Sequence, residues 1–123
     1  MKYVPDGMPR VIPRIAVDDP QGLVEFIKRV FDASGEFQTQ RPTELRIGDS
    51  LIMVGSTVER ELMPAFLYVY VEDTDAAFSL ALTYGAKSIE QPQETPYGDR
   101  RGMIRDRWGN TWQIATHRGE FKG

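Results

Sequence analysis

The chain of 123 residues carries one pattern twice, and this repeat restricts its fold more than any other feature. Val17–Asp18–Asp19 matches Val71–Glu72–Asp73 at an offset of 54 residues, and each tripeptide follows a strand-like segment and precedes a helix-like one. Each copy is too short to bury a sheet alone, so two modules are expected to share one. The repeat predicts an α+β fold: two βαβββ modules forming a curved mixed sheet with helices on the convex face.

The first module begins with a predicted strand at residues 11–17, VIPRIAV, which alternates and is bounded by Pro9. Pro20 suits the first turn of a helix, with Asp18 or Asp19 as its cap. Apolar residues then recur at helical spacing through Phe31. Three strands are predicted after this helix, at 36–40, 43–47 and 50–54, and a Gly48–Asp49 turn joins the last two in a hairpin.

The second module repeats the plan with a strand at 65–71 and a helix that Glu72–Asp73–Thr74 caps and Gly85 ends. The segment 92–99, PQETPYGD, is predicted to be a loop because proline and glycine interrupt it. We expect a single domain, 1–123, with modules at about 10–56 and 64–117 and a linker at 57–63. The three strands after the helix are predicted at 87–91, 100–106 and 110–116, as an antiparallel meander with the module's first strand alongside.

Composition excludes several classes of protein. The chain has no cysteine, which rules out disulfides, thiolate zinc sites and iron–sulfur clusters. Its 15 basic and 18 acidic residues give a net charge of −3, which is not the signature of a nucleic-acid binder. No apolar run is long enough to cross a bilayer, and MKYVPDGMPR lacks the apolar stretch of a secretory signal. We therefore expect a cytoplasmic protein with neither a nucleic-acid nor a membrane partner.

Several stretches resemble the vicinal oxygen chelate superfamily, which holds glyoxalase I, the bleomycin-resistance proteins, fosfomycin-resistance enzymes and extradiol dioxygenases. They are RIAVDD with LVEFIKRVF, LRIGDSLIMVG, LYVYVEDTDAAF and YGDRRGMIRDRWGNTWQIAT. The resemblance runs from about Val11 to His117 and is strongest to small stand-alone proteins of the glyoxalase/bleomycin-resistance type. One departure is Arg107, where family members usually have a proline.

The resemblance implies four metal-ligand positions, two from each module, and here they fall on Ile12, Met53, Phe66 and Gln113. Only Gln113 offers an oxygen, and a thioether is a poor ligand for a hard or borderline divalent ion. The chain has one histidine, so a site with two histidines and one carboxylate cannot be built within it. We expect no metal, no cofactor and no catalytic residue, with His117 a surface residue beyond the last strand.

The concave face of the predicted sheet is the candidate binding site for a flat, partly apolar organic molecule. The aromatic residues on it are equally compatible with ordinary strand core. Arg14 needs a partner on a buried strand, either Glu44 or Asp106 in an ion pair or an anionic group of a ligand. Segment 97–99 is predicted to form a flap over the mouth of this site. The predicted ligand-binding residues are Arg14, Met53, Phe66, Tyr68, Tyr70, Met103, Arg105, Trp108 and Gln113.

These features favour a metal-free binding protein similar to the bleomycin-resistance proteins, which captures a small molecule and sequesters a drug or toxin. Two copies are expected to form a homodimer, because a bare sheet edge or concave face would leave a large apolar patch exposed. The alternative is a lyase or isomerase of the superfamily with an atypical or absent metal site. A third possibility is an accessory module whose concave face binds another protein.

Overall fold

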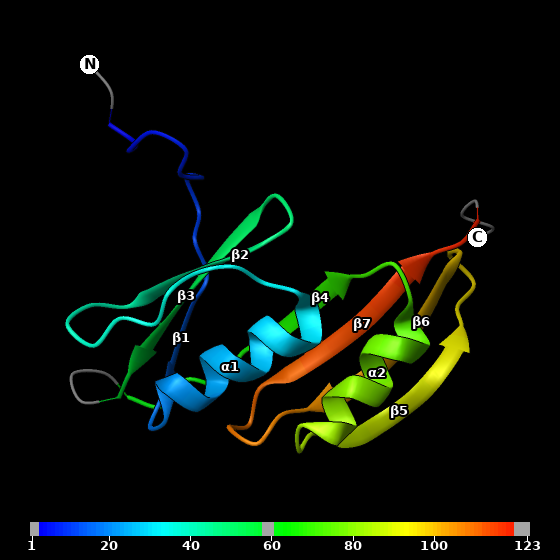
Figure 1. The fold of residues 1–123 in the computed structure, drawn as a ribbon. Coiled ribbons are helices and arrows are strands. Elements are labelled where there is room, and N and C mark those ends of the chain that lie inside the picture. The colour runs from blue at the N-terminus through cyan, green and yellow to red at the C-terminus, as the bar shows by residue number, and fades with distance from the viewer. Residues whose placement is uncertain (1–2, 58–60, 120–123) are drawn as a thin grey trace. The chain divides into compact units, whose positions relative to one another are not determined.

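The structure is a computed structural model that describes residues 3–57 and 61–119. The chain divides into two compact units, with the boundary between Met63 and Pro64. The architecture is α+β, and each unit combines one helix with one mixed sheet (Figure 1). Of the predicted linker 57–63, residues 58–60 lie outside the described part of the chain. No helix among the described residues is long and apolar enough to span a membrane.

The first unit contains strand β1 (Arg14–Val17), helix α1 (Pro20–Phe31), and strands β2 (Thr43–Ile47) and β3 (Ser50–Ser56). The strand order is β1-β3-β2, with β1 parallel and β2 antiparallel to β3. The helix buries its apolar stripe and packs against this sheet.

The start of α1 agrees with the predicted capping. The Asp19 side chain accepts a hydrogen bond from the Gly22 amide at 3.1 Å, and Pro20 occupies the first helical turn. Gly48 has a φ of 60° in the turn between β2 and β3, so the predicted hairpin is also confirmed.

The prediction of a strand at 36–40 is wrong, because the structure has no strand there. Only Ser34 pairs with the sheet, through reciprocal backbone hydrogen bonds with Arg46 of 3.0 and 2.9 Å, and the chain then runs as a loop. Gly35 turns the backbone with a φ of 146°, and Pro42 has no amide hydrogen to offer a ladder. Pro13 similarly delays β1, which begins at Arg14 rather than at residue 11.

The second unit contains β4 (Phe66–Tyr70), α2 (Thr74–Thr83), β5 (Lys87–Glu94), β6 (Asp99–Arg105) and β7 (Thr111–His117). The strand order is β4-β7-β6-β5. The last three strands form the predicted antiparallel meander, and β4 runs parallel to β7. The loop predicted at 92–99 is shorter in the structure, because β5 continues through Pro92 to Glu94. An edge strand tolerates a proline there.

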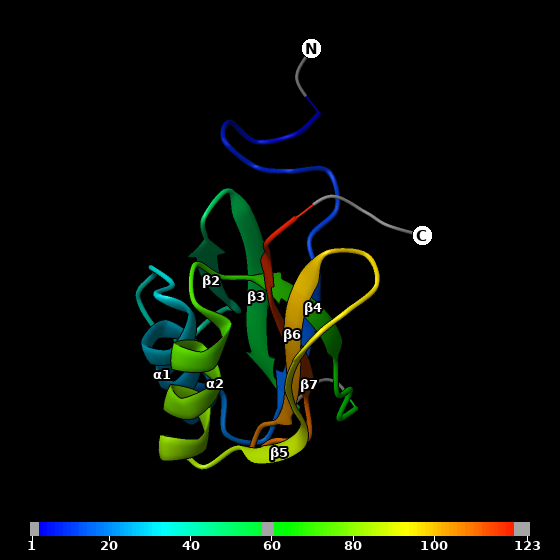
Figure 2. The same cartoon turned by 90° about the vertical axis from the view of Figure 1, so that its right-hand side faces the viewer.

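Helix α2 covers one face of this four-stranded sheet (Figure 2). Asp73 caps it by accepting from the Ala76 amide at 3.1 Å. Gly102 of β6 lies directly under the helix, since a Cβ added there would be 2.9 Å from the Phe78 ring. Ile104 and Trp112 are fully buried. Because side chains alternate along a strand, the odd-numbered residues of β6 and β7 face away from α2.

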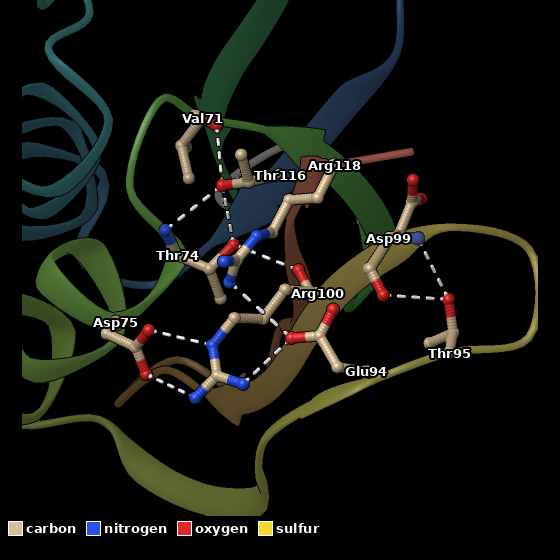
Figure 3. A network of polar contacts seen from close by, with 9 residues as sticks. All are labelled: Val71, Thr74, Asp75, Glu94, Thr95, Asp99, Arg100, Thr116 and Arg118. Carbon is tan, nitrogen blue, oxygen red and sulfur yellow. Dashed lines mark hydrogen bonds and ion pairs between the residues drawn. The ribbon is translucent and has the colours of Figure 1, made fainter. Parts of the chain in front are cut away.

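A network of hydroxyl groups fixes the beginning of α2 on the sheet (Figure 3). The Thr116 hydroxyl donates to the Val71 carbonyl at 2.8 Å and accepts from the Thr74 amide at 3.1 Å. The Thr74 hydroxyl lies 2.8 Å from that of Thr116 and donates to the Arg100 carbonyl at 3.0 Å. These contacts hold α2, which is the helix of this unit, to one side of the sheet, so the other side carries no helix of the same unit.

The same close-up shows an ion-pair network at the surface (Figure 3). The Arg100 guanidinium contacts both oxygens of Asp75, at 2.8 and 3.0 Å, and a Glu94 oxygen at 3.0 Å. These hydrogen bonds, first that with Asp75, raise the pKa of Arg100, and the Arg100 contact in turn lowers the pKa of Asp75. The network joins the first turn of α2 to β5 and β6, and its carboxylates remain exposed.

Candidate functional site

The face of the four-stranded sheet opposite α2, called here the helix-free face, gathers most of the predicted ligand-binding residues. Tyr68 of β4 pairs in register with Gln113 of β7, and Gln113 pairs with Met103 of β6. Two residues earlier in β4, Phe66 pairs with Thr111 of β7, and Thr111 pairs with Arg105 of β6. The structure therefore brings together six predicted residues from three strands: Phe66, Tyr68, Tyr70, Met103, Arg105 and Gln113.

The aromatic side chains of this face lie outside the core. Phe66 is 67% exposed, Tyr70 61% and Tyr68 38%. The rings of Tyr68 and Tyr70 contact each other edge to face, with centroids 5.3 Å apart. Exposed rings carried on a sheet are available for stacking, whereas Trp112 on the other face is fully buried.

A buried carboxylate lies at one end of the face. Asp99 is 1% exposed, and its Oδ2 atom accepts hydrogen bonds from the hydroxyls of Tyr68 at 2.5 Å and Tyr70 at 2.8 Å. Its Oδ1 atom lies 2.9 Å from Nδ1 of His117, which pairs with Asp99 in the β6–β7 register. Thr95 fixes the backbone of Asp99, because its hydroxyl donates to the Asp99 carbonyl at 2.8 Å (Figure 3). Three strands thus meet at one carboxylate.

The protonation states of this group follow from its contacts. Burial alone would raise the pKa of Asp99, but hydrogen bonds from Tyr68, His117 and Tyr70 outweigh it and hold this pKa below the ordinary aspartate value. Burial, and then the hydrogen bond to Asp99, raises the pKa of Tyr68. The bond to Asp99 is also the main reason that the pKa of Tyr70 is raised. At neutral pH a carboxylate therefore lies between two protonated phenols.

Arg101 extends the polar group across the sheet. Its Nη1 atom donates to the Tyr97 hydroxyl at 2.6 Å, and its Nη2 atom lies 3.4 Å from Glu90. The Tyr97 hydroxyl lies 3.5 Å from that of Tyr68. The Nε atom of Arg101 is buried and has no hydrogen-bond partner among the described residues. Hydroxyl groups therefore connect the guanidinium to the Asp99 carboxylate, and we call the connected residues Tyr68, Tyr70, Glu90, Tyr97, Asp99, Arg101 and His117 the Asp99 cluster.

The sequence patterns do not predict this cluster, because they place His117 at the surface and Tyr97 and Asp99 in a flap. His117 is in fact 58% exposed, but its ring is held by the buried carboxylate. A signal was present, because Asp99 and His117 are equally distant from Trp108 at the turn of the β6–β7 hairpin. A symmetric hairpin register places such residues opposite each other.

Two predicted ligand-binding residues belong to the first unit. Arg14 of β1 pairs in register with Met53 of β3, and Met53 pairs with Glu44 of β2. Arg14 is exposed, and no ion pair joins it to Glu44 within the described first unit. Asp106, the other predicted partner, is engaged by its own turn through Asn110 and Trp112.

Arg14 also borders a cavity of about 680 Å³ within the first unit. The loop that replaces the predicted strand at 36–40 forms one wall, and the lining includes Gln38, Arg41 and Met63. The remaining predicted residue, Trp108, is half-buried in the turn between β6 and β7, with the Arg107 guanidinium 5.7 Å from its ring centroid.

The four positions implied for a metal do not supply a ligand set. Ile12 and Phe66 are hydrocarbon, Met53 is a thioether, and only Gln113 carries an oxygen donor. No group of three or more histidine, aspartate or glutamate residues is placed to hold a metal ion within residues 3–57 and 61–119. The side chains present do not fit the divalent ion of the superfamily's enzymes, and the absence of a metal from the protein stays a prediction.

Comparison with known proteins relates this architecture to others. The chain is 26% identical to Mb0911c, an uncharacterised protein of Mycobacterium bovis, over 87% of its length and 82% of the relative. Its structure resembles the crystal structure of TioX from Micromonospora sp. ML1, with a TM-score of 0.75 and 25% identity over 89% of this chain and 99% of that one. It shares the fold of a glyoxalase/bleomycin resistance protein/dioxygenase family enzyme from Burkholderia phytofirmans PsJN, with a TM-score of 0.71 and 20% identity over 85% and 94% of the two chains.

A sequence profile of one family matches residues 10–114, which span most of both units and most of the helix-free face. The match agrees with the paired modules and with the resemblance carried by the turn at Asp106. The chain belongs to the Glyoxalase/Bleomycin resistance protein/Dioxygenase superfamily, whose members form the vicinal oxygen chelate group.

Proposed function

We propose that this protein binds a small, flat, partly apolar organic molecule on the helix-free face, without using a metal ion. The observation that carries the proposal is the row of Phe66, Tyr68 and Tyr70 along β4, whose rings stay exposed while the opposite face of the sheet is packed. Exposed aromatic residues in a row are costly in water unless something covers them. A planar ligand stacked on the rings would remove them from solvent.

The neighbouring side chains suit the same kind of ligand. Met103 is flexible and polarisable, so it adapts to an irregular apolar outline. Gln113 offers both a donor and an acceptor at the centre of the face. Binding of this kind needs only affinity, which agrees with a sequestering role for drugs or toxins and with the loss of metal-compatible side chains.

Thermal-shift and fluorescence titrations with naphthalene and quinoline derivatives test the proposal. We expect saturable binding to the intact protein that Phe66→Ala weakens roughly tenfold, since burial of a ring contributes about 1.5–3 kcal/mol. Tyr3→Ala is the matched control, because Tyr3 is also an exposed aromatic residue but belongs to the first unit. Equal losses in both variants, or no binding by the unaltered protein, would contradict the proposal.

The second candidate is a lyase or isomerase of the superfamily with an atypical or absent metal site. One observation favours it: buried Asp99 orients the imidazole of His117, an arrangement that suits a general base. The test is exchange of the C–H hydrogen beside the carbonyl of a small hydroxyketone in deuterated water, followed by NMR. Exchange that is lost in His117→Gln supports the enzyme, and exchange no faster than in buffer contradicts it.

Homodimer formation, a cytoplasmic location and the absence of nucleic-acid and membrane partners remain predictions from the sequence. Arg14, Met53 and Trp108 also remain predicted ligand-binding residues. Sedimentation analysis with and without ligand tests the dimer. An assembly with a different protein, rather than a homodimer that binds a small molecule, would favour the accessory-module alternative.

A further inference from the structure

The Asp99 cluster has a fixed direction of hydrogen bonding. An ionised carboxylate can only accept hydrogen bonds, so Tyr68, Tyr70 and His117 must each direct a hydrogen toward Asp99. For neutral His117 this selects the tautomer with the hydrogen on Nδ1, which leaves Nε2 with an unshared electron pair. Each of the three groups therefore presents an acceptor on the side away from the carboxylate.

The positive charge of Arg101 does not reverse the direction of the hydrogen bonds to Asp99. Arg101 is only 21% exposed, and it directs its two end nitrogens to Tyr97 and to Glu90. Tyr97 accepts from Arg101, so its own hydrogen is free to be directed to the oxygen of Tyr68, 3.5 Å away. Hydrogen bonds thus run from Arg101 through Tyr97 and Tyr68 to Asp99, and donation in one direction strengthens each successive bond.

Ala115 shows that the cluster is compact. By register it lies between Tyr70 of β4 and Arg101 of β6 on the helix-free face. It is nevertheless fully buried, so the larger side chains around it close over the strand. With Asp99 and Glu90 against Arg101, the cluster has a net formal charge of −1 when His117 is neutral.

We propose that the hydroxyl oxygen of Tyr70 and the Nε2 atom of His117 form an acceptor subsite that selects planar aromatic ligands bearing an N–H donor, while the Tyr68 oxygen accepts from Tyr97. The inference rests on the proposed function and names the ligand class of the same face. An aromatic amine places its N–H against the acceptors while its ring stacks on Tyr70 and Phe66. An aromatic carboxylate would place its own acceptor oxygens against the acceptors of the subsite. It would also be repelled by the net negative charge of the Asp99 cluster.

Three probes with one ring system test this selectivity: 2-naphthylamine, 2-methoxynaphthalene and 2-naphthoate. At neutral pH we expect the amine to bind the unaltered protein roughly tenfold more tightly than the methoxy compound, as one good hydrogen bond allows, with the carboxylate weakest. Tyr70→Phe keeps the ring but removes one acceptor, so the advantage of the amine should fall several-fold. Tyr3→Phe removes a hydroxyl from the first unit and should change nothing.

Asp99→Asn supplies a sharper test, because asparagine carries one acceptor oxygen and one donor NH2 group. With the oxygen directed to Tyr68 and Tyr70, the NH2 group donates to Nδ1 of His117, which moves the imidazole hydrogen to Nε2 and turns that acceptor into a donor. The preference should therefore shift from the amine toward the methoxy compound and the carboxylate. Circular dichroism establishes that this variant is folded. If it is unfolded, Tyr70→Phe alone decides.

The outcomes separate the two proposals. A preference for the amine that Tyr70→Phe reduces supports the acceptor subsite. Tighter binding of the carboxylate or the methoxy compound by the unaltered protein overturns the subsite and leaves the proposed function standing. If none of the three naphthalenes binds, the proposed function fails and the subsite fails with it.

Discussion

The Oδ2 atom of Asp106 lies 2.8 Å from the indole nitrogen of Trp112, and both residues are buried in the second unit. The other oxygen, Oδ1, accepts from the backbone amides of Trp108 and Asn110, both at 2.9 Å. Asn110 in turn accepts from the Ala65 amide at 2.8 Å, next to the start of β4. One carboxylate thus connects the β6–β7 turn, the core tryptophan and the strand that carries the aromatic row.

Asp106→Asn should destabilise the protein by about 3 kcal/mol, because an amide group cannot accept all of these hydrogen bonds and leaves buried N–H groups unsatisfied. Urea denaturation followed by tryptophan fluorescence measures the loss. The control is Asp75→Asn, which removes an exposed carboxylate of the same unit and should have a much smaller effect. Equal midpoints for Asp106→Asn and the unaltered protein would contradict this account of the turn.

Gly102→Ala should cost about 1–3 kcal/mol, because the added methyl group would overlap the Phe78 ring and force α2 away from the sheet. Thermal and urea unfolding give the change in the free energy of unfolding. Gly119→Ala is the control, since no described residue other than its chain neighbours lies within 4 Å of the methyl group it would add. Combining Gly102→Ala with Phe78→Leu should recover part of the loss, and simple additivity of the two changes would argue against the contact.

The repeat, the two helix caps and the β2–β3 hairpin were predictable because each depends on local chemistry: Asp19 and Asp73 at caps, Pro20 in a first turn, Gly48 with a positive φ. The strand at 36–40 was wrongly predicted because its composition suits a strand, whereas pairing depends on the partner's register. Alternation correctly placed Tyr68, Met103 and Gln113 on one face.

The Asp99 cluster was harder to predict because its members are spread from residue 68 to residue 117, and only the pairing of β4, β7 and β6 in one sheet brings them together. A burial pattern cannot reveal it either. Asp99 is a charged residue beside a glycine turn, which normally indicates exposure, and it is buried only because three hydrogen-bond donors surround it.

Asp99 should make stability depend on pH in the acid range. Its pKa is lowered in the folded protein, so its contribution is fully present above the ordinary aspartate pKa of 3.8 and is lost as the pH falls through the lower folded value. Urea denaturation from about pH 6 to about pH 2 should show a shallower dependence for Asp99→Asn than for the unaltered protein. Parallel curves would mean that the carboxylate is not stabilised by its three donors.

Tyr68 should ionise at a higher pH than an ordinary tyrosine, because its pKa is raised. Burial and the adjacent Asp99 carboxylate both raise its pKa, so the neutral phenol stabilises the fold below the ordinary tyrosine pKa of 10.0, and this contribution is lost as the pH rises beyond it. Ultraviolet titration of the phenolate band should show a late step that Tyr68→Phe removes. Tyr3→Phe, which changes a tyrosine of the first unit, is the control and should leave the late step in place; loss of the late step in that variant would contradict the assignment.

Nickel, zinc, iron(II) and manganese should produce no one-to-one binding heat in calorimetric titrations, since Ile12, Met53 and Phe66 offer no suitable ligand atoms. Chelator treatment should leave the melting temperature unchanged, and plasma mass spectrometry of untagged protein should find no stoichiometric metal. One tightly held ion per chain would show that the ligand positions were assigned to the wrong residues and would strengthen the enzyme alternative.

The parallel pairing of β4 with β7 also restricts the order in which the second unit can fold during its synthesis. During translation Phe66, Tyr68 and Tyr70 are each made 45 residues before their partners in β7, which is their only ladder partner within the described sheet. The meander of β5, β6 and β7 can assemble from neighbours, but the aromatic strand has to wait for β7. The surface proposed to receive a ligand is therefore completed only when the final strand, β7, is available.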